Sequence, residues 1–155
     1  MTRRPGLDQI LDRTGALIAQ PAEALAAQAG ALADEMLAAG EAVLETWLEA
    51  KGAAPTDATS EGFRLLALHR QAARGDPSFN ACRETCRELV YHRNLILSDL
   101  AAPATGQRVR LGAMVLRHLA LFIGGKLDVA GLGDFCCSSR GLRGAETPVP
   151  LGETP

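Results

Sequence analysis

Two cysteines spaced four residues apart are the residues of this sequence whose type and spacing most suggest chemistry. On a helix, Cys82 and Cys86 would share one face, so their sulfurs could together bind Cu(I) or Zn(II), with His92 as a third ligand. The same spacing disfavours a disulfide, because helical Cβ atoms lie about 5–6 Å apart and a disulfide requires about 3.5–4.5 Å. The competing interpretation is packing, because both cysteines share a stripe with Leu89 and Ile96, and buried cysteine behaves as a small hydrophobic residue.

A second pair of thiols, Cys136 and Cys137, follows in a glycine-rich segment. If this segment folds back, the four thiols of the chain could converge into a closed tetrahedral metal site. The spacing is not that of a known zinc module, and unpaired surface thiols are the alternative.

Three histidines fall one on each of three predicted helices, at positions 69, 92 and 118. Only His69 lies in the middle of its apolar arc, so we expect it inside the bundle, whereas His92 and His118 lie at the margins of theirs. A di-iron site is disfavoured because it requires Glu-x-x-His, and here Glu88 and His92 are four residues apart.

Arg93 lies on the same helical stripe as Cys82 and Cys86, so we expect it to be buried and to require acceptors. One interpretation is an ion pair with an acidic helix elsewhere in the bundle. The functional interpretation is a pocket for an anion or carboxylate, in which His69 and Arg93 bind the ligand with support from His92.

The composition favours helices over strands. Hydrophobic residues make up 47% of the 155 residues and aromatic residues only 4%, and Ala and Leu prevail over the β-branched types that favour strands. Hydrophobic positions at helical spacing predict helices over residues 7–19, 21–51, about 56–74, 77–100 and 105–123. Within these, Asp76-Pro77 predicts a helix start and Gly124-Gly125 a helix end.

The sequence therefore predicts an all-α fold, a four- to five-helix bundle with a flexible C-terminal tail. The bundle is assigned to residues 1–130 as a single domain, and the Gly/Ser/Pro-rich tail to residues 131–155.

Two of the predicted helices stand out by their apolar surface. The helix at 21–51 has a broad apolar arc with small residues such as Ala33 and Gly40, which would let a partner helix approach closely. The helix at 105–123 is apolar nearly all round, with Arg110 and Arg117 in a narrow polar stripe, and is expected to be the central helix.

The formal net charge is −2, but the charge is unevenly distributed. Residues 20–52 are rich in Asp and Glu, whereas residues 53–127 carry an excess of Lys and Arg, so acidic and basic helices are expected to pair across the bundle. The arginines at 64, 70, 74, 83 and 87 lack the interleaved aromatic residues of a nucleic-acid surface, and we expect a solvated or salt-bridged face instead.

The N-terminus begins with an arginine pair, Arg3-Arg4, but Asp8, Asp12 and Arg13 interrupt the apolar stretch that an export signal requires. No stretch approaches the roughly 18 apolar residues of a membrane span. With four cysteines and no export signal, the expected location is the cytoplasm and the expected state of the cysteines is the thiol.

The sequence contains no phosphate-binding loop, nucleophile elbow or zinc-protease helix. The expected function is a non-enzymatic interaction or structural role, in which the protein forms a homodimer or packs on a protein partner through the long helix at 21–51. The alternative is a small metal-binding or redox module that uses Cys82, Cys86 and His92, with Cu or Zn as its cofactor. No cofactor is expected in the first case, and nucleic acid is expected as a partner in neither.

Overall fold

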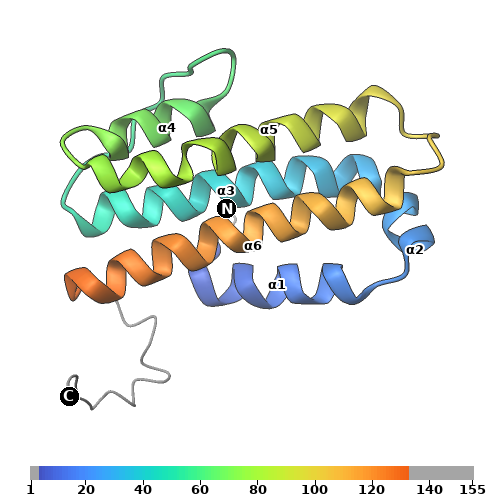
Figure 1. The fold of residues 1–155 in the computed structure, drawn as a ribbon, viewed down its shortest axis with the longest axis horizontal. Coiled ribbons are helices and arrows are strands. Elements are labelled where there is room, and N and C mark those ends of the chain that lie inside the picture. Colours follow the sequence, from blue (N-terminus) through green and yellow to red (C-terminus); the bar gives the residue numbers. More distant parts are fainter. Residues whose placement is uncertain (1–3, 133–155) are drawn as a thin grey trace.

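The computed structural model describes residues 4–132, and these form a bundle of six α-helices and one 3₁₀ helix. In chain order they are α1 (Leu7–Ala19), α2 (Ala22–Ala27), α3 (Ala29–Ala50), α4 (Arg64–Ala73), η1 (Pro77–Cys82), α5 (Arg83–Ser98) and α6 (Thr105–Ala130). Figure 1 shows α3, α5 and α6 running the length of the bundle, with α1 and α4 at opposite edges. The predicted all-α fold is confirmed, and within residues 4–132 no helix is long and apolar enough to cross a membrane.

Four helix boundaries differ from the sequence-based expectation. The predicted helix at about 56–74 begins only at Arg64, because residues 60–63 form a turn closed by the backbone hydrogen bonds between Ser60 and Phe63. The predicted helix at 21–51 is broken at Gln28, where the backbone leaves helical geometry (φ −117°, ψ 13°) between α2 and α3. The predicted helix at 77–100 starts as the 3₁₀ helix η1, and Asp76 caps it by accepting a hydrogen bond from the Ser78 amide at 3.2 Å.

The predicted helix end at Gly124-Gly125 is wrong, because α6 continues to Ala130 and stops at Gly131, whose φ of +68° is the left-handed conformation of a C-terminal cap. Ile123 and Leu127, on either side of the glycine pair, are both buried. Burying these side chains outweighs the cost of about 1 kcal/mol for each helical glycine.

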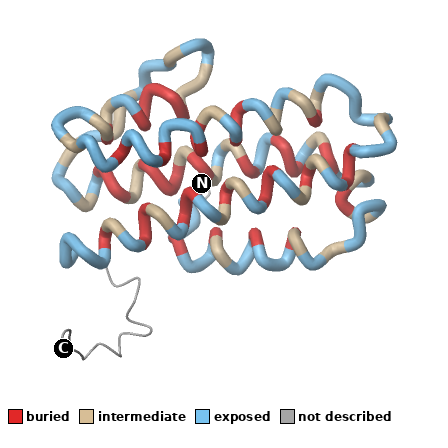
Figure 2. The backbone as a smooth tube through the Cα atoms, in the orientation of Figure 1, coloured by how far each residue is buried: buried red, intermediate tan, exposed pale blue. Residues whose placement is uncertain are grey.

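The predicted central position of the helix at 105–123 is confirmed, because α6 packs against α1, α2, α3 and α5. The other long helix of the core is α3, which packs against α4, α5 and α6. Its side chains Leu32, Val43 and Leu44 are at most 2% exposed, and Figure 2 shows buried positions along the whole helix. A Cβ atom on Gly40 would lie 2.6 Å from Leu89 Cδ2, so this small residue admits the chain's own α5. The apolar arc that was expected to receive a partner is covered by helices of the same chain, and we place no partner there.

The acidic side of α3 is bound by arginines from three other parts of the chain. Each of these arginines contacts at least one α3 carboxylate: Arg4 with Glu45 and Glu49, Arg13 with Glu35, Arg64 with Glu41 and Glu45, and Arg93 with Asp34. The predicted pairing of the acidic helix with basic partners is therefore confirmed.

The start of α6 crosses α2 at very short range. A Cβ atom built on Gly106 would lie 2.0 Å from the carbonyl oxygen of Ala22 and 2.6 Å from its carbonyl carbon. These are backbone atoms of a packed segment, so they cannot turn away as the end of a side chain can.

The substitution Gly106→Ala should therefore destabilise the protein, by about 1–3 kcal/mol or more, because the two backbones must separate. The control is Gly15→Ala in α1, where the nearest atom, Arg117 Nη1, would be 3.9 Å away. That change should stabilise the protein by about 0.5–1 kcal/mol, because alanine loses less backbone entropy in a helix. Chemical denaturation measures both, and equal stabilities of the two variants would contradict the close crossing of α2 and α6.

Candidate functional site

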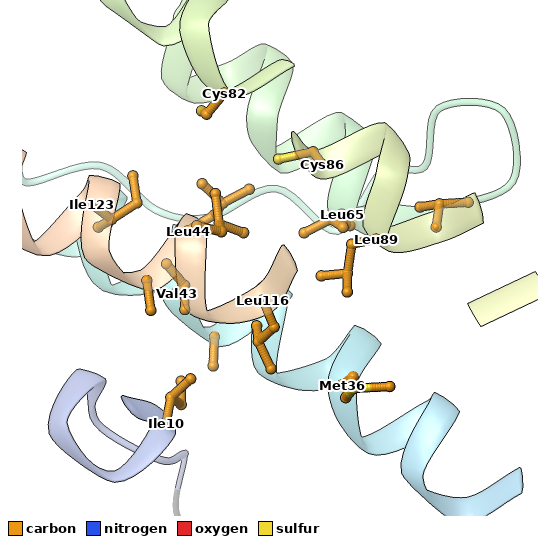
Figure 3. Packing of buried hydrophobic residues seen from close by; sticks show 14 of the residues in the cluster. Ile10, Met36, Val43, Leu44, Leu65, Cys82, Cys86, Leu89, Leu116 and Ile123 are labelled. Atoms are coloured by element: carbon orange, nitrogen blue, oxygen red, sulfur yellow. The ribbon is translucent and has the colours of Figure 1, made fainter. Parts of the chain in front are cut away.

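The two predicted reactive thiols lie where η1 joins α5. Cys82 ends η1 and is the N-cap residue of α5, and Cys86 lies one turn further along α5. Their exposed fractions are 1% and 0%, and Figure 3 shows both side chains among the core residues around Leu44 and Leu65. Packing is thus one role of both cysteines.

His69 of α4 is buried, as the sequence predicted, and shares an acceptor with Cys82. Its Nε2 donates a hydrogen bond to the carbonyl oxygen of Phe79 at 2.8 Å, and the Cys82 thiol donates to the same oxygen at 3.5 Å. Burial opposes a charge on the imidazole, but the interactions with Cys82 and Phe79 outweigh it and raise the pKa of His69 above its ordinary value.

The acidities of the two thiols diverge. The Cys86 thiol acts on the Cys82 sulfur and, with His69, outweighs burial and lowers the pKa of Cys82 to about 6. The position of Cys82 at the N-terminus of α5 also favours a thiolate. The pKa of Cys86 is raised, first because its proton is held by Cys82 and then because it is buried. Of the two, Cys82 is the thiol that ionises first.

The predicted metal ligands are not assembled. Within residues 4–132 no group of three or more His, Cys, Asp or Glu side chains is placed to hold a metal ion, so Cys82, Cys86 and His92 do not form a three-ligand site. His92 is half-buried, its Nδ1 atom has no hydrogen-bond partner, and burial lowers its pKa. Cys136 and Cys137 lie outside the described residues.

Arg93 is less buried than predicted and does not join His69. Its side chain is 29% exposed, pairs with Asp34 of α3 at 3.3 Å and lies over the Phe63 ring at 5.8 Å from the ring centroid. The interpretation as an ion pair with the acidic helix is therefore confirmed, and the expectation of full burial is wrong. The cause is the position of Arg93 beside α3 at the bundle surface, where Asp34 is itself 65% exposed.

A different set of arginines surrounds His69. A cavity of about 540 Å³, here called the arginine cavity, is lined by α4, the turn before it and the η1–α5 segment. The charged and titratable residues in its lining are His69, Arg70, Arg74, Arg83, Arg87 and Glu61. Four arginines and a histidine thus face one carboxylate.

Helical spacing explains how the arginines come together. Arg70 and Arg74 are four residues apart on α4 and its C-cap, and Arg83 and Arg87 are four residues apart on α5. Residues at this spacing lie on one side of a helix, and α4 packs against α5. The C-terminal end of α4 carries negative partial charge, which stabilises Arg70 and Arg74 there.

Glu61 is positioned by a tight turn. Glu61 and Gly62 have φ of 55° and 86°, and Ser60 and Phe63 exchange two backbone hydrogen bonds of 3.0 Å around them. Two successive left-handed residues are the geometry of a type I′ turn. The Glu61 carboxylate then accepts bonds of 2.9 and 3.1 Å from both terminal nitrogens of Arg87.

Arg70 and Arg83 attract the Glu61 carboxylate and help to lower its pKa, but within residues 4–132 no carboxylate lies at ion-pair distance from Arg70, Arg74 or Arg83. Arg70 reaches only the Ser60 hydroxyl, at 3.5 Å, and neither Arg74 nor Arg83 forms an ion pair within the described part of the chain. The sequence had grouped these arginines but interpreted them as a solvated or salt-bridged face. The structure confirms that interpretation, because Arg64 and Arg87 form ion pairs and Arg70, Arg74 and Arg83 are exposed to solvent. The signal in the sequence for their grouping around one cavity was two pairs of arginines spaced by four, at 70/74 and 83/87.

Comparison with known protein families, curated proteins and solved structures found no match.

We predict that Cys82 titrates as an acidic thiol. In a Cys136→Ser/Cys137→Ser background, the ultraviolet thiolate absorbance of the native protein should rise with a midpoint near pH 6. Cys82→Ser should abolish this transition, and Cys86→Ala should move it towards the ordinary thiol value of about 8.5, because the Cys86 proton no longer stabilises the thiolate.

The lowered pKa of Cys82 also makes the stability of the protein depend on pH. A thiol whose pKa is lowered by folding adds stability that is full above about pH 8.5 and is lost as the pH falls towards 6. As the pH rises from about 6 to 8.5, the free energy of unfolding of the wild type should therefore increase relative to that of Cys82→Ser. A thiolate midpoint at or above pH 8 in the native protein would contradict the arrangement.

Proposed function

We propose that this protein binds a small anionic molecule, one that carries a phosphate or carboxylate group, in the arginine cavity. The main support for the proposal is that Arg70, Arg74 and Arg83 line one cavity while no carboxylate of residues 4–132 lies at ion-pair distance from them. The chain as a whole has a net charge of −2, so this local excess of positive charge is not a property of the overall composition.

The side-chain chemistry fits oxyanions. A guanidinium presents its N–H groups in a planar fork that matches two oxygens of a carboxylate or phosphate. The chain itself supplies an example, because the two nitrogens of Arg87 hold the two oxygens of Glu61 in this way. An oxyanion beside Glu61 could be held similarly by Arg83 and Arg74.

The size and charge of the cavity support a small ligand. A volume of about 540 Å³ lies within the range of pockets that hold small molecules. The positive charge of the cavity comes from its arginines, because a protonated His69 is offset by the neighbouring Cys82 thiolate that raises its pKa. The described lining residues include no Phe, Tyr or Trp on which a nucleic-acid base could stack.

The other functions expected from the sequence have less support. Partner binding through the long helix lacks a free surface, because the arc is buried within the bundle. A metal module lacks a third ligand beside Cys82 and Cys86 in the described residues. A redox role would require a reactant to reach the Cys82 thiol, which is only 1% exposed.

The test is a calorimetric titration at low ionic strength with two probes, inorganic pyrophosphate and citrate. We expect saturable binding of at least one probe to the wild-type chain. Arg83→Gln and Arg74→Gln should each weaken that binding about 10- to 100-fold, because a hydrogen bond to a charged group contributes about 1.5–3 kcal/mol. Glu61→Gln should strengthen binding, because it frees Arg87 for the probe.

The matched control is Arg13→Gln, which also removes one positive charge but lies on α1 and pairs with Glu35. It should leave the dissociation constant within about twofold of the wild-type value. Equal weakening by Arg13→Gln and Arg83→Gln would show general attraction to a charged surface, and would overturn the proposed site, as would the absence of saturation with both probes.

A further inference from the structure

A second cavity adjoins the arginine cavity beside α5. Its volume is also about 540 Å³, and the linings of the two cavities share Glu61, Leu66 and Arg87. The two cavities therefore meet at the Arg87–Glu61 ion pair, next to α4 and α5, which lie side by side (Figure 1). We call the second one the tyrosine cavity, and its remaining lining residues are Phe63, Glu84, Glu88, Val90, Tyr91 and Asn94.

The two cavities differ in charge. Beyond the shared ion pair, three arginines and His69 line the arginine cavity, whereas Glu84 and Glu88 line the tyrosine cavity. Glu84 attracts Arg87 and Glu88 attracts His92 at longer range, but within residues 4–132 neither glutamate lies at ion-pair distance from a basic group. A ligand that fills both cavities should therefore carry an oxyanion at one end and hydrogen-bond donors at the other.

Aromatic side chains also distinguish the tyrosine cavity. Tyr91 is 59% exposed, and Phe63 lines the same cavity, with the Arg93 guanidinium 5.8 Å from its ring centroid. Tyr91 packs against the His92 ring at a centroid distance of 5.4 Å, but more than half of the residue stays open to solvent. Its ring is thus a surface on which a flat ligand ring can stack, which the arginine cavity lacks.

The spacing along α5 indicates the length of such a ligand. Arg83, Arg87 and Tyr91 follow one another at intervals of four residues, so they lie on one side of the helix. Arg83 and Tyr91 are about 12 Å apart along the helix axis, at 1.5 Å for each residue. An oxyanion at Arg83 and a ring at Tyr91 must therefore be joined by a spacer, as a sugar joins the base and the phosphates of a nucleotide.

We propose that the ligand of these joined cavities is a nucleoside diphosphate whose base carries an amino group, such as adenine or cytosine. The inference rests on the proposed anion binding and names its ligand class. The diphosphate lies among the arginines of the arginine cavity, and the base stacks on Tyr91. The amino group of the base donates a hydrogen bond to Glu84 or Glu88, because carboxylates accept from such groups.

The role of Tyr91 is tested by calorimetry at low ionic strength with adenosine diphosphate and inorganic pyrophosphate. Wild type should bind adenosine diphosphate about 5- to 100-fold more tightly than pyrophosphate, because base stacking adds to the contacts of the phosphates. Tyr91→Ala should remove this difference and leave the dissociation constant of pyrophosphate unchanged. Tyr91→Phe is the matched control, because it keeps the ring and should keep the difference. Circular dichroism verifies that both variants fold.

The role of the glutamates is tested with inosine diphosphate, whose base has a carbonyl in place of the amino group. Wild type should bind adenosine diphosphate about 10-fold or more tightly than inosine diphosphate, since the carboxylates cannot accept a bond from a carbonyl. Glu84→Gln/Glu88→Gln should erase this preference, because a carboxamide can donate as well as accept. Equal binding of the two nucleotides by wild type would overturn the amino-bearing base.

The outcomes separate this inference from the anion site itself. Equal affinity of the wild type for adenosine diphosphate and pyrophosphate, or a difference that survives in Tyr91→Ala, would overturn the nucleotide ligand while the anion site stands. The absence of saturable binding of both probes would overturn the proposed anion binding, and the nucleotide with it.

Discussion

The packing and ion pairs of α3 determine where the neighbouring helices lie. Apolar side chains of α3 contact α4, α5 and α6, and the carboxylates along its remaining side bind arginines from α4, α5 and the segment around α1. Because α3 makes apolar contacts on one side and ion pairs on the other, it determines the positions of α4 and α5. The position of α4 against α3 places His69 inside the bundle, and the position of α5 brings Cys82 to the same Phe79 carbonyl oxygen.

The carboxylates of α3 also decide which arginines are available for a ligand. Arg4, Arg13, Arg64 and Arg93 are held by Asp or Glu of that helix. Among the described residues of the arginine cavity, only Arg87 forms an ion pair, with Glu61 of the turn before α4. The excess positive charge at this place follows from the distribution of acidic residues along the chain, and it is the physical basis of the proposed anion binding.

Much of this fold could be predicted from the sequence, because helical periodicity and the prevalence of Ala and Leu directly reflect local structure. The burial of His69 and the partners of the acidic helix followed from the same patterns. Boundaries were harder: Gly124-Gly125 resembles a helix end, and only the buried neighbours Ile123 and Leu127 show why α6 continues. The sequence placed Arg93 on the side of α5 that faces α3, but it could not show that Arg93 meets the exposed, acidic side of α3 at Asp34.

The arginine cavity could not be predicted, because it depends on which of several equivalent arginines find a carboxylate in space. The most direct test is an NMR titration of the arginine Nε–H signals with inorganic pyrophosphate. We expect saturable shifts for Arg70, Arg74 and Arg83, and no comparable shifts for Arg13, Arg64 and Arg93, which already pair with carboxylates of α3. Shifts of similar size for all six arginines, or for none, would contradict it.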